Sequence, residues 1–188
     1  MDRQGFGIRL VALILDVVAL IIMGLIVGLI FGGGLVISYR MGAAVPGRFM
    51  ANLVGTLLAL AYWSTEIFRA ASPGKMLLGL RIASETGETA TQNQLVTRWV
   101  VKNSGGLIMV LATIVGAVVP IFGFVLAIMA GLANLAIFIG CFFTLGTSRQ
   151  ALHDTIAHTA VYKVAAPAGF PVTPMGSPAS MPPPPPAV

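Results

Sequence analysis

Residues 8–31 read IRLVALILDVVALIIMGLIVGLIF, an apolar run with one arginine near its start and one aspartate inside it. At about 1.5 Å per residue, a helix of this length crosses a hydrocarbon core of roughly 30 Å. A charge at mid-depth costs about 2.5–3.5 kcal/mol on insertion scales. Arg9 can reach toward the headgroups, but Asp16 lies about two turns deeper. We therefore expect Asp16 to have a partner, a water-filled cavity or a proton.

The composition indicates an integral membrane protein. The chain has 188 residues, of which 57% are hydrophobic and 9% charged, and its mean hydropathy is +0.94. Soluble domains carry about 25% charged residues. The net charge of +5 favours anionic lipid and membrane topology over nucleic acid as its explanation.

Few side chains are available for catalysis or for metal binding. Cys141 is the one cysteine, and His153 and His158 are the only histidines, at a spacing that does not place them on one helix face. We therefore predict no disulfide, no metal site and no cofactor. No combination of nucleophile, base and orienting group is visible, so we expect that the protein is not an enzyme.

The chain divides into a short leader, a membrane domain and a tail. Residues 1–7 form the leader, and an uncleaved span is favoured over a signal peptide because the apolar run is long and contains an acid. Residues 8–164 form the membrane domain. Residues 165–188 are rich in proline, alanine, glycine and serine, which predicts disorder or polyproline II.

We predict an all-α membrane protein with four transmembrane helices and short cytoplasmic amphipathic segments. The predicted spans are residues 8–31, 49–68, 99–119 and 121–145, although 99–145 could also form a kinked or re-entrant segment. Gly32–Gly34 would end the first helix, and residues 35–48 would form a loop.

The region between the second and third spans, residues 69–104, is too polar to cross a membrane. Ser72-Pro73 predicts a short helix on the membrane surface, Leu80–Ser84 a strand, and the sequence from about Gln92 an amphipathic helix. Near the C-terminus, Thr147 or Ser148 could cap a short helix that runs to His158. Residues 159–164 form a second candidate strand, which could pair with the first.

The basic residues predict the topology. Four spans place both termini and residues 69–104 on one side of the membrane. That side holds nine basic residues, against only Arg40 and Arg48 on the other: Arg3, Arg9, Arg69, Lys75, Arg81, Arg98, Lys102, Arg149 and Lys163. The positive-inside rule then predicts a multi-pass protein of the cytoplasmic (inner) membrane, typical of bacteria, with both termini in the cytoplasm.

Three glycines recur at every fourth position of the first span. Gly24, Gly28 and Gly32 share one helix face, and such a face lets another backbone approach closely. Packing within the chain is the simpler interpretation of this face. Packing against a second copy or another membrane subunit is the alternative.

Three segments, taken together and in order, resemble the RDD family of integral membrane proteins, which is named for one arginine and two aspartates. The segments are Gly7-Ile8-Arg9-Leu10 followed by Ala12 and Ile14-Leu15-Asp16; Ser72-Pro73-Gly74-Lys75-Met76-Leu77-Leu78-Gly79-Leu80-Arg81; and Arg149-Gln150-Ala151-Leu152-His153-Asp154 with Thr159 and Val161. The resemblance covers roughly residues 3–164. It maps the family's arginine to Arg9 and its aspartates to Asp16 and Asp154, and it implies transport, including cation–proton exchange, as one suggested activity.

A polar site is expected where the first span meets the cytoplasmic segments. Arg9 and Asp16 are seven residues apart, which returns them to nearly one helix face about 10 Å apart along the axis. Asp154 could fold back toward Arg9, with help from Lys75 or Arg81. Such a cluster could bind a cation or a proton, or it could be an ion-pair network that fixes helix packing.

Two details of this site stay open. His153 next to Asp154 could be a pH-sensitive neighbour, although surface histidines are commoner. Lys75 is expected to meet lipid headgroups, because the spacing of a phosphate-binding loop is missing around it.

Two functional classes follow from these features. The first is a small transporter or cation/proton exchanger that uses the intramembrane arginine and aspartates. The second is a non-catalytic accessory or scaffolding subunit of a larger membrane complex, suggested by the glycine face, the small size and the tail. The expected partners are the lipid bilayer, other membrane-protein subunits or a second copy, and a proline-recognising protein for the tail. No nucleic acid is expected.

Overall fold

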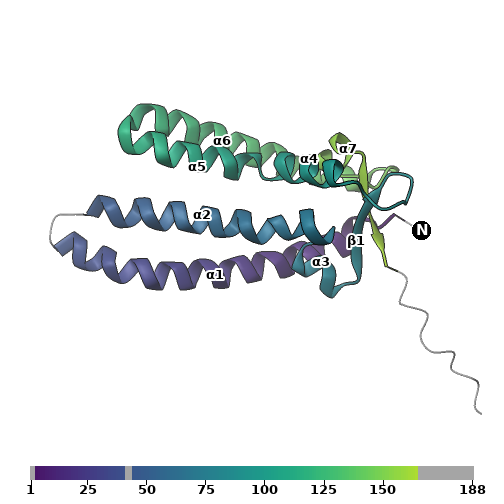
Figure 1. The fold of residues 1–188 in the computed structure, drawn as a ribbon, viewed down its shortest axis with the longest axis horizontal. Helices are drawn as coiled ribbons and strands as arrows, with labels where there is room; N and C mark the ends of the chain where they lie inside the picture. Colours follow the sequence, from purple (N-terminus) through teal and green to yellow (C-terminus); the bar gives the residue numbers. More distant parts are fainter. Residues whose placement is uncertain (1–2, 41–43, 165–188) are drawn as a thin grey trace, which may run out of the picture.

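The computed structural model describes residues 3–40 and 44–164, with side-chain positions for residues 3–30 and 50–164. Four long helices run roughly side by side as two antiparallel pairs, and the short elements gather at the end that holds the N-terminus (Figure 1). The elements in chain order are α1 (Phe6–Arg40), α2 (Ala44–Arg69), α3 (Pro73–Leu77), β1 (Leu80–Ser84), α4 (Gln92–Lys102), α5 (Ser104–Val118), α6 (Pro120–Cys141), the 3₁₀ helix η1 (Phe142–Leu145), α7 (Leu152–Ile156) and β2 (Thr159–Lys163).

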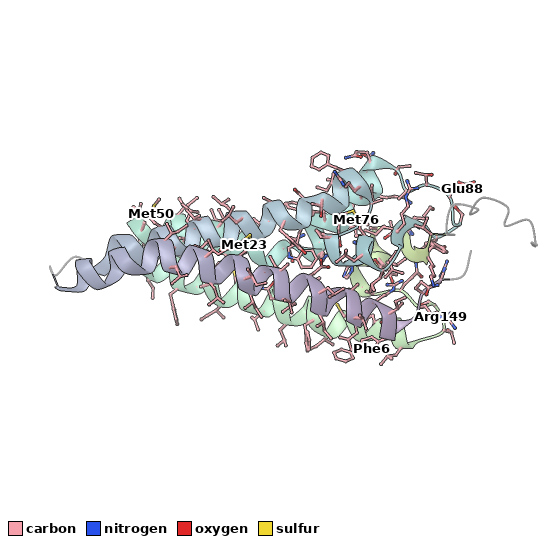
Figure 2. All side chains as sticks on the ribbon, turned by 90° about the horizontal axis from the view of Figure 1, so that it is seen from below. Phe6, Met23, Met50, Met76, Glu88 and Arg149 are labelled. Carbon is pink, nitrogen blue, oxygen red and sulfur yellow. The ribbon has the colours of Figure 1, made fainter. Side chains whose placement is uncertain are left out.

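The long helices expose apolar side chains along most of their length, whereas polar side chains collect at one end. Met23 and Met50 lie along the helical part, and Glu88 and Arg149 lie at the end with the short elements (Figure 2). Leucines, isoleucines and phenylalanines of α1 and α6 are largely exposed, which is costly in water and favourable in lipid. We call the end formed by α3, α4, α7, β1 and β2 the cap.

Two helical segments are long and apolar enough to cross a membrane. They are Phe6–Ile30 and Pro120–Leu145, and a third is added if α4 and α5 count as one span. The predicted set of four spans is therefore supported only in part by length and composition. α2 also contains Asn52, Tyr62 and Glu66, polar residues that lower its hydropathy.

The first hairpin differs from the prediction. α1 continues through Gly32–Gly34 to Arg40, and α2 already begins at Ala44, so the predicted loop over residues 35–48 was wrong. Glycine costs about 1 kcal/mol per residue relative to alanine within a helix. A backbone in an apolar surrounding loses more if its hydrogen bonds are left unmade, so the helix persists across the glycines.

The predicted third span also differs, because it is broken at Asn103. α4 and α5 meet there at a bend of 59°. The Asn103 side chain donates to the carbonyl of Trp99 at 2.9 Å, and the Asn103 carbonyl accepts from Leu107 at 2.9 Å, so the bend keeps its backbone partners. The amphipathic helix predicted from Gln92 is confirmed as α4, and its N-terminus carries a capping box between Thr91 and Gln94.

Tight glycine packing closes the second hairpin, α5–α6. A Cβ added at Gly116 would lie 3.2 Å from the Cα of Gly123, and one added at Gly123 would collide with the Gly116 backbone. Pro120 begins α6 at its first position, where its missing N–H costs no hydrogen bond.

The cap contains the small sheet, as predicted. β1 and β2 pair antiparallel, with Leu80 opposite Lys163 and Ile82 opposite Val161. Their inward side chains join one apolar cluster with residues of α1 and α4 and the chain between them: Ala12, Ala70, Leu80, Ile82, Ala90, Leu95 and Val161. This cluster fixes the sheet against the N-terminal part of α1.

The helix predicted after Thr147 or Ser148 starts later than expected. α7 begins at Leu152 with Ala151 at the N-cap position, and Arg149 before it has a positive φ of 51°. The capping group is the Asp154 carboxylate, which accepts from the Ala151 N–H at 3.2 Å. The short helix α3 begins at Pro73, as the sequence predicted.

Candidate functional site

Asp16 of α1 is buried in a pocket of neutral donors. Its Oδ1 accepts from the Tyr62 hydroxyl at 2.7 Å and from the Gly74 N–H at 2.7 Å, and its Oδ2 accepts from the Ser72 hydroxyl at 2.6 Å. Only 1% of Asp16 is exposed. The carboxylate thus joins α1 to α2 and to the start of α3.

The local sequence around α3 explains how the backbone reaches Asp16. Ser72 precedes the helix, and Gly74 is its second residue, so an N–H that has no intrahelical partner faces the carboxylate. A Cβ at Gly74 would collide with the Ala12 carbonyl oxygen and with the Asp16 carboxylate. Glycine is therefore required here by close approach.

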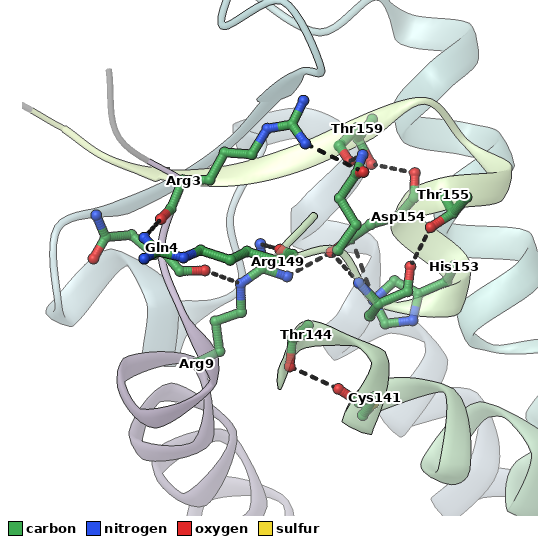
Figure 3. A network of polar contacts seen from close by, with 12 residues as sticks. Arg3, Gln4, Arg9, Cys141, Thr144, Arg149, His153, Asp154, Thr155 and Thr159 are labelled. Atoms are coloured by element: carbon green, nitrogen blue, oxygen red, sulfur yellow. Dashed lines mark hydrogen bonds and ion pairs between the residues drawn. The ribbon is translucent and has the colours of Figure 1, made fainter. Parts of the chain in front are cut away.

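A second group of charges lies around Arg98 of α4, which is 2% exposed. Its Nε donates to Asp154 Oδ1 at 2.7 Å, and its Nη1 donates to Glu66 Oε2 at 2.5 Å. Arg9 Nη1 reaches the other oxygen of Asp154 at 2.5 Å, and Arg9 Nη2 donates to the Arg149 carbonyl at 2.9 Å. Figure 3 shows Arg9 extending from α1 toward Asp154 and the Arg149 backbone.

Glu66 near the end of α2 receives two lysines as well. Lys75 Nζ donates to Glu66 Oε1 at 2.6 Å, and Lys102 Nζ donates to the same oxygen at 2.8 Å. Lys102 Nζ also lies 3.4 Å from the centre of the Trp63 ring, within the range of a cation–π contact. We call Arg9, Glu66, Lys75, Arg98, Lys102 and Asp154 the charge network.

Opposing effects set the protonation of the α7 carboxylate. Burial alone raises the pKa of Asp154, but Arg98 and Arg9 outweigh burial and hold that pKa well below its usual range. The carboxylate is therefore ionised at neutral pH.

His153 is neutral at physiological pH. Burial lowers the pKa of its imidazole to about 3; Asp154 opposes this shift and Arg98 adds to it. Its Nε2 lies 3.1 Å from Arg98 Nη2. Arginine can only donate, so this nitrogen accepts and the proton sits on Nδ1. In the described part of the chain, Nδ1 has no hydrogen-bond partner.

The structure joins some predicted site residues and separates others. Arg9 and Asp154 form the predicted ion pair, and Lys75 belongs to the same network. Asp16 has its own set of neutral donors and contacts none of the charged groups as an ion pair within residues 3–30 and 50–164. The single cluster expected around both aspartates was therefore wrong, because Asp16 binds neutral donors of α2 and the start of α3 whereas Asp154 pairs with Arg9 and Arg98.

Three further expectations need correction. Lys75 is buried against Glu66 and does not extend to the headgroups, and burial lowers its pKa, with Arg98 adding to the shift and Glu66 opposing it. His153 is buried, so it is not a surface histidine. Arg81 is exposed on β1 and takes part in none of the ion pairs of the described residues.

Glu66, Arg98 and Lys102 were missing from the predicted site, although the sequence held a signal for each. Glu66 lies near the end of a predicted span, where an acid is as unusual as at position 16. Arg98 lies three residues after Leu95, and Lys102 lies four residues after Arg98, so the three side chains share one face of α4, its apolar face. A cation on the buried face of an amphipathic helix predicts a buried carboxylate partner.

The glycine face of α1 is open. A Cβ at Gly24 or Gly28 would meet no atom of the described residues within 4 Å, so packing within the chain, the simpler interpretation, was wrong at these two positions. Gly32 is helical but lies outside the residues whose side-chain surroundings the structure describes.

Three widely separated segments meet at this end of the molecule: the start of α1 with Arg9 and Asp16, the start of α3 with Gly74, and α7 with Asp154. A family model described as the RDD family matches residues 3–158, most of the chain. The chain belongs to the RDD family. No curated protein and no solved structure matches it. In this RDD protein, Arg9 and Asp154 pair directly, and Asp16 holds the start of α3.

Family membership and the apolar helices together identify a membrane protein. Several of its polar contacts attach the cap to the helices. Arg9 and Asp16 connect α1 to the cap at two points, and Glu66 connects α2 to it. The proline-rich tail, residues 165–188, lies outside the described residues.

Proposed function

We propose that this RDD protein is a non-catalytic accessory or scaffolding subunit of a larger assembly in the bacterial cytoplasmic membrane. One observation carries the proposal. Both oxygens of Glu66 and both oxygens of Asp154 are already bound by cations of the same chain. A network of this kind specifies how elements are arranged and leaves no carboxylate oxygen free to exchange a cation.

In this proposal the chain crosses the membrane four times, through α1, α2, α5 and α6. The paired antiparallel helices and the collection of polar groups at one end support this arrangement. The positive-inside rule then assigns the cap, with its basic residues, and both termini to the cytoplasm. The lipid bilayer is the first partner of the exposed apolar side chains.

The open glycine face supports assembly with another membrane helix. Gly24 and Gly28 face outward from the described part of the chain. Glycines at this spacing allow close packing of helices, which requires another helix to cover this face. Self-association or a heterologous subunit would meet this need. The proline-rich tail adds a segment that a proline-recognising cytoplasmic protein could bind.

Affinity purification from membranes in a mild detergent, followed by mass spectrometry and native electrophoresis, tests the proposal. We expect a stoichiometric membrane partner or a homo-oligomer, and we expect Gly28→Leu to reduce that association while Leu29→Ala, at a neighbouring exposed position, leaves it intact. Recovery of a lone monomer from both wild type and Gly28→Leu would contradict the proposal.

Transport is the second candidate, and Asp16 is the observation that favours it. This buried carboxylate contacts three neutral donors and no cation among the described residues, an unusual state inside a predicted span. Cation or proton flux in proteoliposomes would then require Asp16. Equal flux through wild type and Asp16→Asn, with both proteins shown to be folded, would eliminate this candidate.

A further inference from the structure

A cavity of about 310 Å³ lies between the two helical hairpins. Its volume is at the lower end of the range for small-molecule sites, roughly 300–1,000 Å³. Apolar side chains form most of its wall, and Lys102 and the neutral imidazole of His153, both of the cap, lie on it too. The lining residues are Leu13, Thr56, Ala59, Leu60, Trp63, Lys102, Asn103, Gly106, Asn134, Ile137, Phe138, Cys141 and His153.

His153 gives this cavity an unused hydrogen-bond donor. The imidazole is more than nine-tenths buried, and its Nε2 is occupied by Arg98. The remaining proton is on Nδ1, which contacts no acceptor in the part of the chain that the structure describes. A buried donor without a partner is unfavourable, so an acceptor oxygen placed there would be stabilised.

The charge balance around the cavity favours an anion. The charge network contains four basic side chains, Arg9, Lys75, Arg98 and Lys102, and two carboxylates, Glu66 and Asp154. Burial lowers the pKa of Lys102 to about 7, against the effect of Glu66, and an anion beside Lys102 would favour its charged form. Lys102 is shared between the network and the cavity wall. A second, smaller cavity of about 90 Å³ is lined by Arg9, Lys75, Arg98, Lys102 and His153, so Lys102 and His153 border both cavities.

We propose that the larger cavity binds an anionic phospholipid, with its phosphate at Lys102 and His153 and part of an acyl chain along the apolar wall. The phosphate oxygens accept from Lys102 Nζ and from His153 Nδ1. Leu60, Ile137 and Phe138 contact the acyl chain. The proposal is independent of the scaffolding function, because a lipid site of this kind fits a subunit or a transporter equally well.

Binding is tested on the full-length protein, purified in mild detergent and freed of co-purified lipid. Native mass spectrometry would compare dioleoyl phosphatidic acid, dioleoyl phosphatidylcholine and glycerol 3-phosphate at equal concentrations. We expect phosphatidic acid to bind at least about tenfold more tightly than phosphatidylcholine, and glycerol 3-phosphate not to bind, because the site needs both the charge and the chain.

A pair of adjacent variants locates the site without altering the charge network. Ala59→Phe fills the cavity, whereas Leu58→Phe changes an exposed position one residue away. We expect the first to weaken phosphatidic acid binding by about tenfold or more and the second to leave it within about twofold. Lys102→Gln, where unfolding temperature shows that it folds, should abolish the preference over phosphatidylcholine.

Three results would overturn the proposal. Equal affinity for phosphatidic acid and phosphatidylcholine would exclude an anion-selective site. Equal affinity of Ala59→Phe and Leu58→Phe would exclude this cavity. Tight binding of glycerol 3-phosphate would assign the cations to a soluble phosphate and exclude a lipid.

Discussion

The Ser72 hydroxyl donates to Asp16 Oδ2 at 2.6 Å, and this bond joins the first long helix to the residue that precedes α3. The Gly74 N–H reaches the other carboxylate oxygen at 2.7 Å. Both donors lie within residues 72–74, so the single carboxylate of Asp16 holds the start of α3 against α1.

Gly74→Ala should weaken this attachment. The added methyl group collides with the Ala12 backbone carbonyl and with the Asp16 carboxylate, which three hydrogen bonds hold in place. Overpacking of this kind typically costs about 1–3 kcal/mol, so we expect a lower unfolding temperature in detergent. Gly55→Ala is the control, because a Cβ there meets nothing within 4 Å and should leave stability equal or raised by up to about 1 kcal/mol. Equal unfolding temperatures for Gly74→Ala and wild type would refute the close contact.

Arg98→Met should be the most damaging single change in the charge network. Arg98 contacts both Glu66 and Asp154, and removal of one partner from a buried ion pair costs about 3–5 kcal/mol. We expect low yield and a large loss of thermal stability. Arg81→Met removes an arginine from an exposed strand position and should change stability by no more than about 0.5 kcal/mol. Comparable losses in the two variants would show that Arg98 is not a central contact.

Acid should destabilise the cap through His153 and Asp154. The pKa of His153 is about 3 in the folded protein and about 6.5 when unfolded, so the unfolded chain takes up the proton first. The stability that His153 contributes is complete above about pH 6.5 and is lost as the pH falls toward 3. Asp154, whose pKa is lowered by Arg98 and Arg9 against the effect of burial, adds a further loss below about pH 4.

Unfolding temperatures in detergent between pH 7.5 and 4.5 would measure the histidine contribution. Loss of stability should approach a slope of about 1.4 kcal/mol per pH unit below pH 6.5. His153→Gln, which cannot titrate, should have a flatter profile over the same interval. A wild-type profile that stays level to pH 4.5 would mean that His153 is not buried as described.

Cysteine labelling in intact bacterial cells tests the proposed topology. In a Cys141→Ser background, Val119→Cys places a thiol at the turn between α5 and α6, and Glu88→Cys places one in the cap. A membrane-impermeant maleimide should label position 119 in intact cells and position 88 only after permeabilisation. A reporter fused after Val188 should give a cytoplasmic signal. Labelling of position 88 from outside would contradict the assignment of the cap to the cytoplasm.

The sequence was informative about local structure and less so about contacts between distant segments. Hydropathy and turn residues located the apolar helices, α3 and both strands, because these depend on neighbours along the chain. The helix through Gly32–Gly34 was missed because local glycine propensity was weighed without the apolar surroundings of the backbone. The Arg9–Asp154 pair was anticipated through family resemblance. Spacing alone does not bring together two residues separated by 145 positions.

The site was predicted incompletely for a related reason. Asp16 and Asp154 were expected in one cluster because both are acids near the same end of the molecule. Their binding partners separate them: Asp16 accepts from Tyr62, Ser72 and Gly74, whereas Asp154 pairs with Arg9 and Arg98. Glu66 was visible as an acid near the end of a span, but its role became clear only when α4 placed Arg98 beside it.

The order in which the network's members are synthesised has a consequence for biogenesis. Arg9 and Arg98 leave the ribosome before Asp154, their shared acid, which comes 145 residues after the first of them. Until then both arginines lack this partner, and in the proposed topology they face the anionic lipid of the inner leaflet, where positive charge favours a cytoplasmic orientation. When α7 arrives, the same charges become internal contacts. In the proposed topology, the arginines that favour a cytoplasmic cap are thus also the ones that later pair with Asp154.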